Sequence, residues 1–266
     1  MYETTYHRPS SVDEAAALFA KGKEAKYLAG GHTLIPVMKQ RLAAPSDVID
    51  LARIKELVGV EGAGDTLTIK AATPHYDVAT SATVQKAIPA LAHLASLIGD
   101  PAVRYRGTIG GSIANNDPAA DYPAAVLALG ATVKTNKRSI AADDFFKGLF
   151  ATALTEGEII TAVSFPVPAK GGYAKMAHPA SRFALTGVFV AKTRSGDVRA
   201  AATGASSNGV MRVPAIEAAL KANWSPAALD SVQVSASGLL TDVHGSADYR
   251  ANLVKVMAQR AVAEAG

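Results

Sequence analysis

Cysteine is absent from this sequence of 266 residues. The chain can therefore form neither a disulfide nor a zinc or iron–sulfur site with thiolate ligands, and any such redox centre has to lie on a partner. Aromatic residues make up only 6% of the chain. The 27 Lys and Arg residues exceed the 23 Asp and Glu residues only slightly and are scattered along the sequence. Stacking platforms and basic patches for nucleic acid are thus not evident.

Long apolar runs are also missing. No stretch approaches the roughly 20 apolar residues of a membrane span, and the charged N-terminal segment lacks the apolar run of a signal peptide. We therefore expect a cytoplasmic protein. Hydrophobic residues make up 49% and charged residues 19% of the chain, which is typical of a soluble protein. The length suggests one or two domains with a substantial core.

Helices and strands are predicted to alternate in the first part of the chain. Ser11 and Glu14 fit a capping box, which predicts a helix over residues 11–21. A strand over 25–29 is predicted to run into Gly30 and Gly31, with a helix starting at Leu34. The further predicted strands are 48–51, 57–60, 66–71 and 159–165, and the further predicted helices are 85–97 and 123–129.

The segment 166–172 is rich in Pro and Gly and is the best candidate for a domain boundary. A second domain is predicted after it. Its predicted strands are 185–192 and 198–203, and its predicted helices are 213–221, 225–231 and 247–264.

The first glycine pair, within Leu28–Pro36, stands where a predicted strand has to turn sharply. Glycine lets backbone N–H groups approach a ligand without a Cβ in the way. Consecutive N–H groups near a helix start form an anion site, and a dinucleotide pyrophosphate is a common occupant. A plain tight turn would explain the same glycines without any ligand. Neither the Rossmann glycine pattern nor the P-loop lysine signature is present.

A second turn of the same kind, Thr108–Ser112, has hydroxyl residues at both ends and Asp121 nearby in the sequence. Two such turns predict a long ligand. A hydroxyl and a carboxylate beside a phosphate-binding turn can bind the hydroxyls of a ribose or ribitol chain.

These motifs resemble a known family. Residues 29–36, 98–112 and 116–123 look like the FAD-binding medium subunit of molybdenum hydroxylases, such as the carbon monoxide, nicotinate and xanthine dehydrogenases. Residues 173–184 resemble the start of that family's C-terminal domain, so the resemblance spans essentially the whole chain. It implies an α+β protein with two α/β FAD-binding subdomains of the PCMH type, similar to vanillyl-alcohol oxidase, and a small C-terminal α+β domain. The implied ranges are 1–56, 57–170 and 171–266.

The resemblance also implies the cofactor-binding residues. The two turns would hold the pyrophosphate and the adjoining chain, and Asp121 would hold ribitol hydroxyls. Ile98 and Gly99 would lie against the isoalloxazine ring, and Ile160 would contact FAD through its backbone. Lys175 would lie near the pyrimidine edge, where a cation favours the anionic reduced flavin. The turn residues implied in this way are Ala29, Gly30, Gly31, His32, Thr33, Leu34, Ile35 and Pro36 in the first turn, and Thr108, Ile109, Gly110, Gly111 and Ser112 in the second.

The function implied is that of an electron-transfer subunit with noncovalent FAD. Molybdopterin would lie on a large partner and 2Fe-2S clusters on a small partner, in a dimer of heterotrimers. No catalytic residue or metal ligand is expected on this chain. Some flavoproteins of the superfold attach FAD covalently at a histidine in a Gly-Gly-His turn, so covalent attachment at His32 is a competing hypothesis. A free-standing FAD oxidase or reductase and a nonenzymatic assembly subunit are two rival functions.

Overall fold

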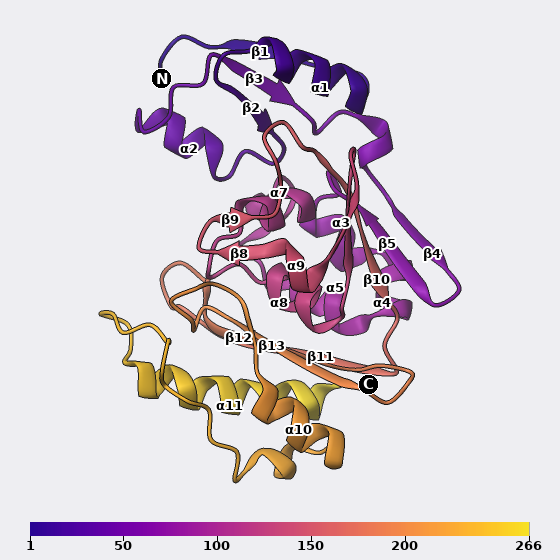
Figure 1. Cartoon of the computed structure of the whole chain (residues 1–266), viewed down its shortest axis with the longest axis vertical. Helices are drawn as coiled ribbons and strands as arrows, with labels where there is room; N and C mark the ends of the chain where they lie inside the picture. Colours follow the sequence, from indigo (N-terminus) through magenta and orange to yellow (C-terminus); the bar gives the residue numbers. More distant parts are fainter. Residues whose placement is uncertain (266) are drawn as a thin grey trace.

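The computed structural model describes residues 1–265 and has three tiers, each built on its own β-sheet (Figure 1). The N-terminal tier is a parallel sheet with the strand order β1-β3-β2. Helix α1 begins after Ser11, whose side chain accepts a hydrogen bond from the Glu14 amide, as the capping pattern predicts. The elements of this tier are β1 (Thr5–His7), α1 (Val12–Lys21), β2 (Ala25–Leu28), α2 (Leu34–Lys39) and β3 (Asp47–Asp50).

The middle tier is an antiparallel sheet with the order β4-β5-β10-β6-β7, packed against a group of short helices. A small hairpin, β8-β9, lies beside it (Figure 1). The elements are η1 (Lys55–Leu57), β4 (Val60–Ala63), β5 (Thr66–Lys70), α3 (His75–Thr80), α4 (Ala82–Ala87), α5 (Pro89–Ser96), α6 (Pro101–Arg104), α7 (Ile109–Asn115), α8 (Tyr122–Ala128), β6 (Thr132–Thr135), β7 (Ser139–Ala141), α9 (Ala142–Phe145), β8 (Phe146–Gly148), β9 (Ala151–Thr152) and β10 (Ile160–Pro166).

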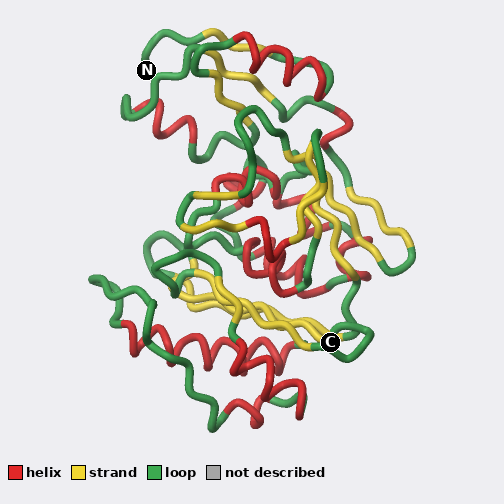
Figure 2. Tube along the Cα trace, in the orientation of Figure 1, coloured by secondary structure: helices red, strands yellow, loops and turns green. Residues whose placement is uncertain are grey.

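The C-terminal tier is an antiparallel sheet with the order β11-β12-β13-β14. Helices α10 and α11 cover one face, and α5 and α8 of the middle tier pack on the other (Figures 1 and 2). Helix α11 approaches β11 so closely that a Cβ on Gly172 would lie 1.8 Å from the Ala261 carbonyl oxygen. The elements are β11 (Lys170–Ala177), β12 (Ala184–Lys192), β13 (Val198–Thr203), β14 (Met211–Arg212), α10 (Pro214–Ala222), η2 (Pro226–Leu229) and α11 (Ala247–Glu264).

Side chains from adjacent tiers share hydrophobic cores. The core of the middle tier includes Tyr173 and Phe189 from the C-terminal sheet. Ile159, which precedes β10, belongs instead to the core of the N-terminal tier. Adjacent tiers are therefore packed against each other and are not joined only by linkers. The mixture of helices and strands confirms the expected α+β class.

Some local predictions were wrong. The helix expected over 85–97 is two helices, α4 and α5, because Pro89 lacks an N–H group and interrupts the backbone ladder. The strand expected over 57–60 is replaced by the end of η1 and the start of β4. The helix expected over 225–231 is the short 3-10 turn η2. None of the helices in the described part of the chain has both the length and the apolarity needed to cross a bilayer.

Candidate functional site

A cavity of about 610 Å³ lies between the N-terminal and middle tiers and is lined by both glycine turns. This volume is within the usual range for ligand pockets, about 300–1,000 Å³. The structure thus brings together residues that are far apart in the sequence. The predicted site residues that line the cavity are Ala29, Gly30, Gly31, His32, Thr33, Leu34, Ile98, Thr108, Gly110, Gly111, Ser112, Asp121 and Ile160.

The first turn offers a row of hydrogen-bond donors. It follows β2, and Gly31 has a φ of +78°, which favours glycine. Within residues 1–265, the amide groups from Gly30 through Leu34 have no hydrogen-bond acceptor. Such consecutive free N–H groups bind anions such as phosphate.

The second turn is built differently. It is the start of α7, where the Thr108 hydroxyl accepts a hydrogen bond of 3.1 Å from the Gly111 amide. The amides of Ile109 and Gly110 donate to carbonyl groups of the segment that follows β5. The amides from Ile109 to Ser112 are therefore already bonded within the chain, whereas those of the first turn from Gly30 through Leu34 are not bonded within residues 1–265.

Glycine allows the two turns to pack directly on each other. A Cβ on Gly30 would lie 2.3 Å from the Arg106 carbonyl oxygen and 2.7 Å from the Gly107 Cα. A Cβ on Gly110 would likewise lie 2.7 Å from the Ala71 carbonyl oxygen. Real Cβ atoms do not approach other heavy atoms so closely. A side chain at Gly30 would push the first turn away from the backbone that leads into the second turn, and one at Gly110 would push α7 away from the segment that follows β5.

Asp121 lies at the cavity wall and is 4% exposed. Its Oδ1 accepts hydrogen bonds from the Tyr173 hydroxyl at 2.6 Å and from Lys175 Nζ at 2.8 Å. Lys175 Nζ also donates to the Leu97 carbonyl oxygen at 2.9 Å. Burial raises the pKa of Asp121, while the Lys175 ammonium and the Tyr173 hydroxyl oppose this shift by stabilising the charged form.

The remaining predicted residues do not line the cavity. Ile35 and Pro36 belong to α2, and the Ile35 side chain packs against Gly31. Gly99, with a φ of +51°, follows α5. Ile109 is fully buried in the core of the middle tier. Lys175 reaches the site through its ion pair with Asp121. Across residues 1–265, no group of three His, Cys, Asp or Glu residues is placed to hold a metal ion.

His75 lines the cavity and was missed by the sequence analysis. The sequence Thr73-Pro74 before it is typical of a helix start, with Thr73 as the N-cap and Pro74 as the first helical residue. In the structure the Thr73 hydroxyl hydrogen-bonds to Gly59 rather than capping α3, and Pro74 is the N-cap. Burial, with smaller effects of His32 and Arg104, lowers the pKa of His75 to about 3.

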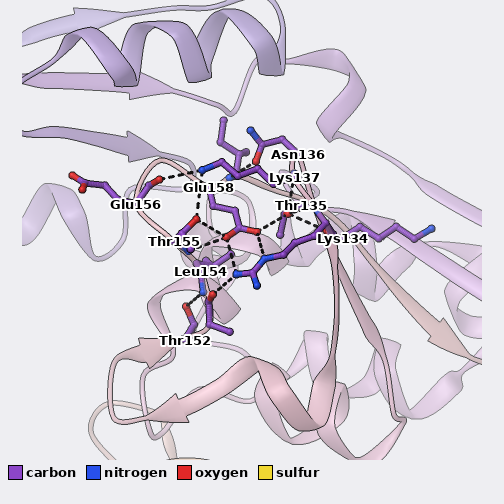
Figure 3. Close-up of polar contacts among 12 residues, drawn as sticks. Lys134, Thr135, Asn136, Lys137, Thr152, Leu154, Thr155, Glu156 and Glu158 are labelled. Atoms are coloured by element: carbon purple, nitrogen blue, oxygen red, sulfur yellow. Dashed lines mark hydrogen bonds and ion pairs between the residues drawn. The ribbon is translucent and has the colours of Figure 1, made fainter.

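Glu158 also lines the cavity and was missed by the sequence analysis. Figure 3 shows the polar contacts around its side chain. Its side chain is fully buried and accepts two hydrogen bonds from Arg138, at 3.0 and 3.1 Å. It also accepts hydrogen bonds from the amide and hydroxyl of Thr155, at 2.8 and 3.0 Å, and from the Thr135 hydroxyl, at 2.8 Å. The hydrogen bonds from Arg138 are the main cause that lowers the pKa of Glu158 to about 2. This network fixes the segment 154–160, which forms one wall of the cavity.

Comparison with known proteins gives consistent matches. The family described as "FAD binding domain in molybdopterin dehydrogenase" matches residues 2–168. The nicotine 6-hydroxylase medium subunit of Paenarthrobacter nicotinovorans is 37% identical, over 98% of this chain and 96% of its own. The carbon monoxide dehydrogenase medium chain of Afipia carboxidovorans is also 37% identical, with the same coverage of each chain.

Solved structures match over nearly the full length. A chain of the cyanide-inactivated Cu,Mo-CO dehydrogenase superposes with a TM-score of 0.88 at 34% identity, covering 99% of this chain and 98% of that one. Quinoline 2-oxidoreductase from Pseudomonas putida 86 gives a TM-score of 0.87 at 29% identity, with coverage of 98% and 96%. These matches confirm the PCMH-type α+β fold expected from the sequence.

Proposed function

Because the chain belongs to the family of FAD-binding domains of molybdopterin dehydrogenases, we propose that it carries noncovalent FAD in the cavity between its glycine turns and transfers electrons within a larger enzyme. The observation that carries this proposal is the row of free amide groups from Gly30 through Leu34 in the wall of a cavity that Asp121 also lines. Free amides suit a diphosphate, and a carboxylate suits sugar hydroxyls.

Different residues of the cavity bind different parts of FAD. The amides of the first turn hold the diphosphate, and Ser112 of the adjoining second turn also lines the cavity. Asp121 accepts hydrogen bonds from ribitol hydroxyls, and the ion pair with Lys175 holds its carboxyl group in place. Ile98, Gly99 and Ile160 lie beside the isoalloxazine ring.

Bound FAD supplies the capacity to accept and release electrons one or two at a time. The chain's own residues bind the cofactor and exclude water from it. No general acid, base or nucleophile is assigned here, because electron transfer through the flavin requires none from this chain. The low exposure of Asp121 and Lys175 supports a site that is closed to solvent on that side.

We also propose domain boundaries after residues 56 and 170. They are supported by the change of sheet between β3 and β4 and again between β10 and β11. The first range contains the first glycine turn, and the second range contains the second glycine turn and Asp121.

We propose that the chain forms a heterotrimer with an iron–sulfur small subunit and a molybdopterin large subunit, and that two such heterotrimers form a dimer. Support comes from relatives named as medium subunits or chains. It also comes from the absence of cysteine, since the electrons must arrive from clusters that this chain cannot ligate.

The test is an absorbance spectrum of the chain mixed with FAD, desalted, and then precipitated with acid. Flavin bands near ~450 nm should stay with the native protein and appear in the supernatant after precipitation. Colour in the pellet would contradict noncovalent binding and indicate attachment at His32. If the isolated chain binds no flavin, the measurement is repeated on the chain copurified with its partners, and failure there would refute the proposal.

A further inference from the structure

His75 is held in one position between the two glycine turns. Its amide donates to the Gly107 carbonyl oxygen at 2.9 Å, and a Cβ on Gly107 would lie 2.5 Å from His75 Nε2. The ring of Tyr122 lies nearby, with a centroid distance of 5.3 Å. His75 is 5% exposed, so the ring has no room to turn out into solvent.

The imidazole has no hydrogen-bond partner within residues 1–265. Nδ1 is buried and unpartnered, and Nε2 adjoins Gly107, which lines the cavity. Buried polar groups in native proteins almost always have a partner in the protein, in ordered water or in a ligand. Because Nδ1 is buried in the protein, Nε2 is the ring nitrogen that remains for a contact with a ligand in the cavity.

The position of the His75 ring indicates which part of FAD it would contact. Gly30, where the free amides begin, packs on Gly107, and Gly107 packs on His75 Nε2. His32 of the first turn is also near enough to influence the ring. His75 thus lies close to the start of the row of free amides, next to the expected position of the diphosphate.

The ring is neutral at physiological pH. The charged or titratable groups that face it are His32 on the first turn, Arg104 on α6 and Tyr122 on α8. Burial is the main cause that lowers its pKa to about 3, and His32 and Arg104 act in the same direction. A neutral imidazole offers one N–H donor and no charge.

We propose that His75 is a further FAD-binding residue, whose Nε2–H donates a hydrogen bond to an oxygen of the diphosphate. This inference rests on the proposed function. His75 would supply a hydrogen-bond donor beside the second turn, where the amides from Ile109 to Ser112 are already bonded within the chain.

The experiment compares His75→Phe and His75→Gln with the wild-type full chain, or with its copurified complex if only that binds FAD. The dissociation constant for FAD is measured by flavin fluorescence, and the melting temperature is measured without FAD. His75→Phe should bind FAD at least about tenfold more weakly, because it loses a hydrogen bond to a charged group. His75→Gln keeps an N–H donor and should recover most of the affinity.

Without FAD, His75→Phe should melt at the same temperature as wild type or higher, because an unpartnered polar ring is replaced by an apolar one. If His75 had a purely structural role, His75→Phe would instead melt at a lower temperature than wild type. His93→Phe, at an exposed position on α5, serves as the control and should change neither quantity.

The ratio of the FAD dissociation constants of His75→Phe and wild type should stay constant between about pH 5.5 and 8.5, because a ring with the cited pKa does not titrate there. A ratio that rises below about pH 6.5 would overturn the neutral-donor assignment. Equal FAD affinity of wild type and His75→Phe would overturn the proposal for His75 alone. Failure of wild type to bind FAD would instead overturn the proposed function.

Discussion

Replacing Glu158 with glutamine should destabilise the chain by about 2 kcal/mol at pH 7. The pKa of this carboxyl falls from 4.5 to about 2 in the folded chain. At 1.36 kcal/mol per pKa unit, that shift corresponds to about 3 kcal/mol. Arg138, its charged partner, is about half exposed, so solvent screening reduces the figure. For a chain of this size the melting temperature should fall by roughly 4–8 °C.

The pH dependence gives a sharper test of the same reasoning. A carboxyl whose folded pKa is depressed stabilises the fold fully above its unfolded pKa, here 4.5, and loses that contribution as the pH falls towards about 2. The difference between wild type and Glu158→Gln should therefore be constant from pH 5 to 8. By the linkage relation it should shrink by roughly half at pH 3.

The assay is chemical denaturation of both proteins at pH 7, 5 and 3. Glu156→Gln is the matched control, since that exposed side chain points away from the network (Figure 3). It should change stability by no more than about 0.5 kcal/mol. Equal stability of the Glu158 and Glu156 variants, or an undiminished difference at pH 3, would refute the account of the network.

Three further substitutions test the site and the packing. Gly30→Ala should abolish tight FAD binding, measured by fluorescence titration, because the new Cβ would push the two turns apart; unchanged affinity would contradict this. Asp121→Ala should destabilise the chain by about 3–5 kcal/mol in urea denaturation by leaving Lys175 buried without a counter-ion. The double variant Asp121→Asn/Lys175→Met should recover much of that stability but not the FAD affinity, and a double variant as unstable as the single one would count against the ion-pair argument. Gly172→Ala should lower the free energy of unfolding by at least about 1–3 kcal/mol, measured by thermal denaturation, because its Cβ would collide with α11. Gly171→Ala, whose Cβ would make only ordinary contacts, should leave the stability nearly unchanged in the same assay.

The glycine turns could be predicted because their constraint is local. A strand followed by Gly-Gly and a helix start already limits the backbone, and Gly31 adopts the positive φ that this arrangement needs. The sequence did not reveal that the amides from Ile109 to Ser112 in the second turn are bonded within the chain. The hydrogen bonds of Ile109 and Gly110 depend on carbonyl groups after β5, which approach the second turn only in the folded chain.

Glu158 and His75 could not be found by pattern. The partners of Glu158 include Arg138 and Thr135, about twenty residues earlier, and their pairing depends on how β6 meets β10. His75 became notable only because its ring nitrogens lack partners, which is a property of the packed interior. Pro89 was visible in the sequence, but the apolar spacing of 85–97 was given more weight than the missing N–H group.

The ion pair between Asp121 and Lys175 joins two tiers whose sequences follow one another. A chain that ended at residue 170 would retain both glycine turns but would leave the Asp121 carboxylate without Tyr173 and without its cation. Asp121 therefore obtains these two hydrogen-bond donors only from β11. If Asp121 holds the cofactor as proposed, a fragment of the first two tiers should bind FAD more weakly than the full chain.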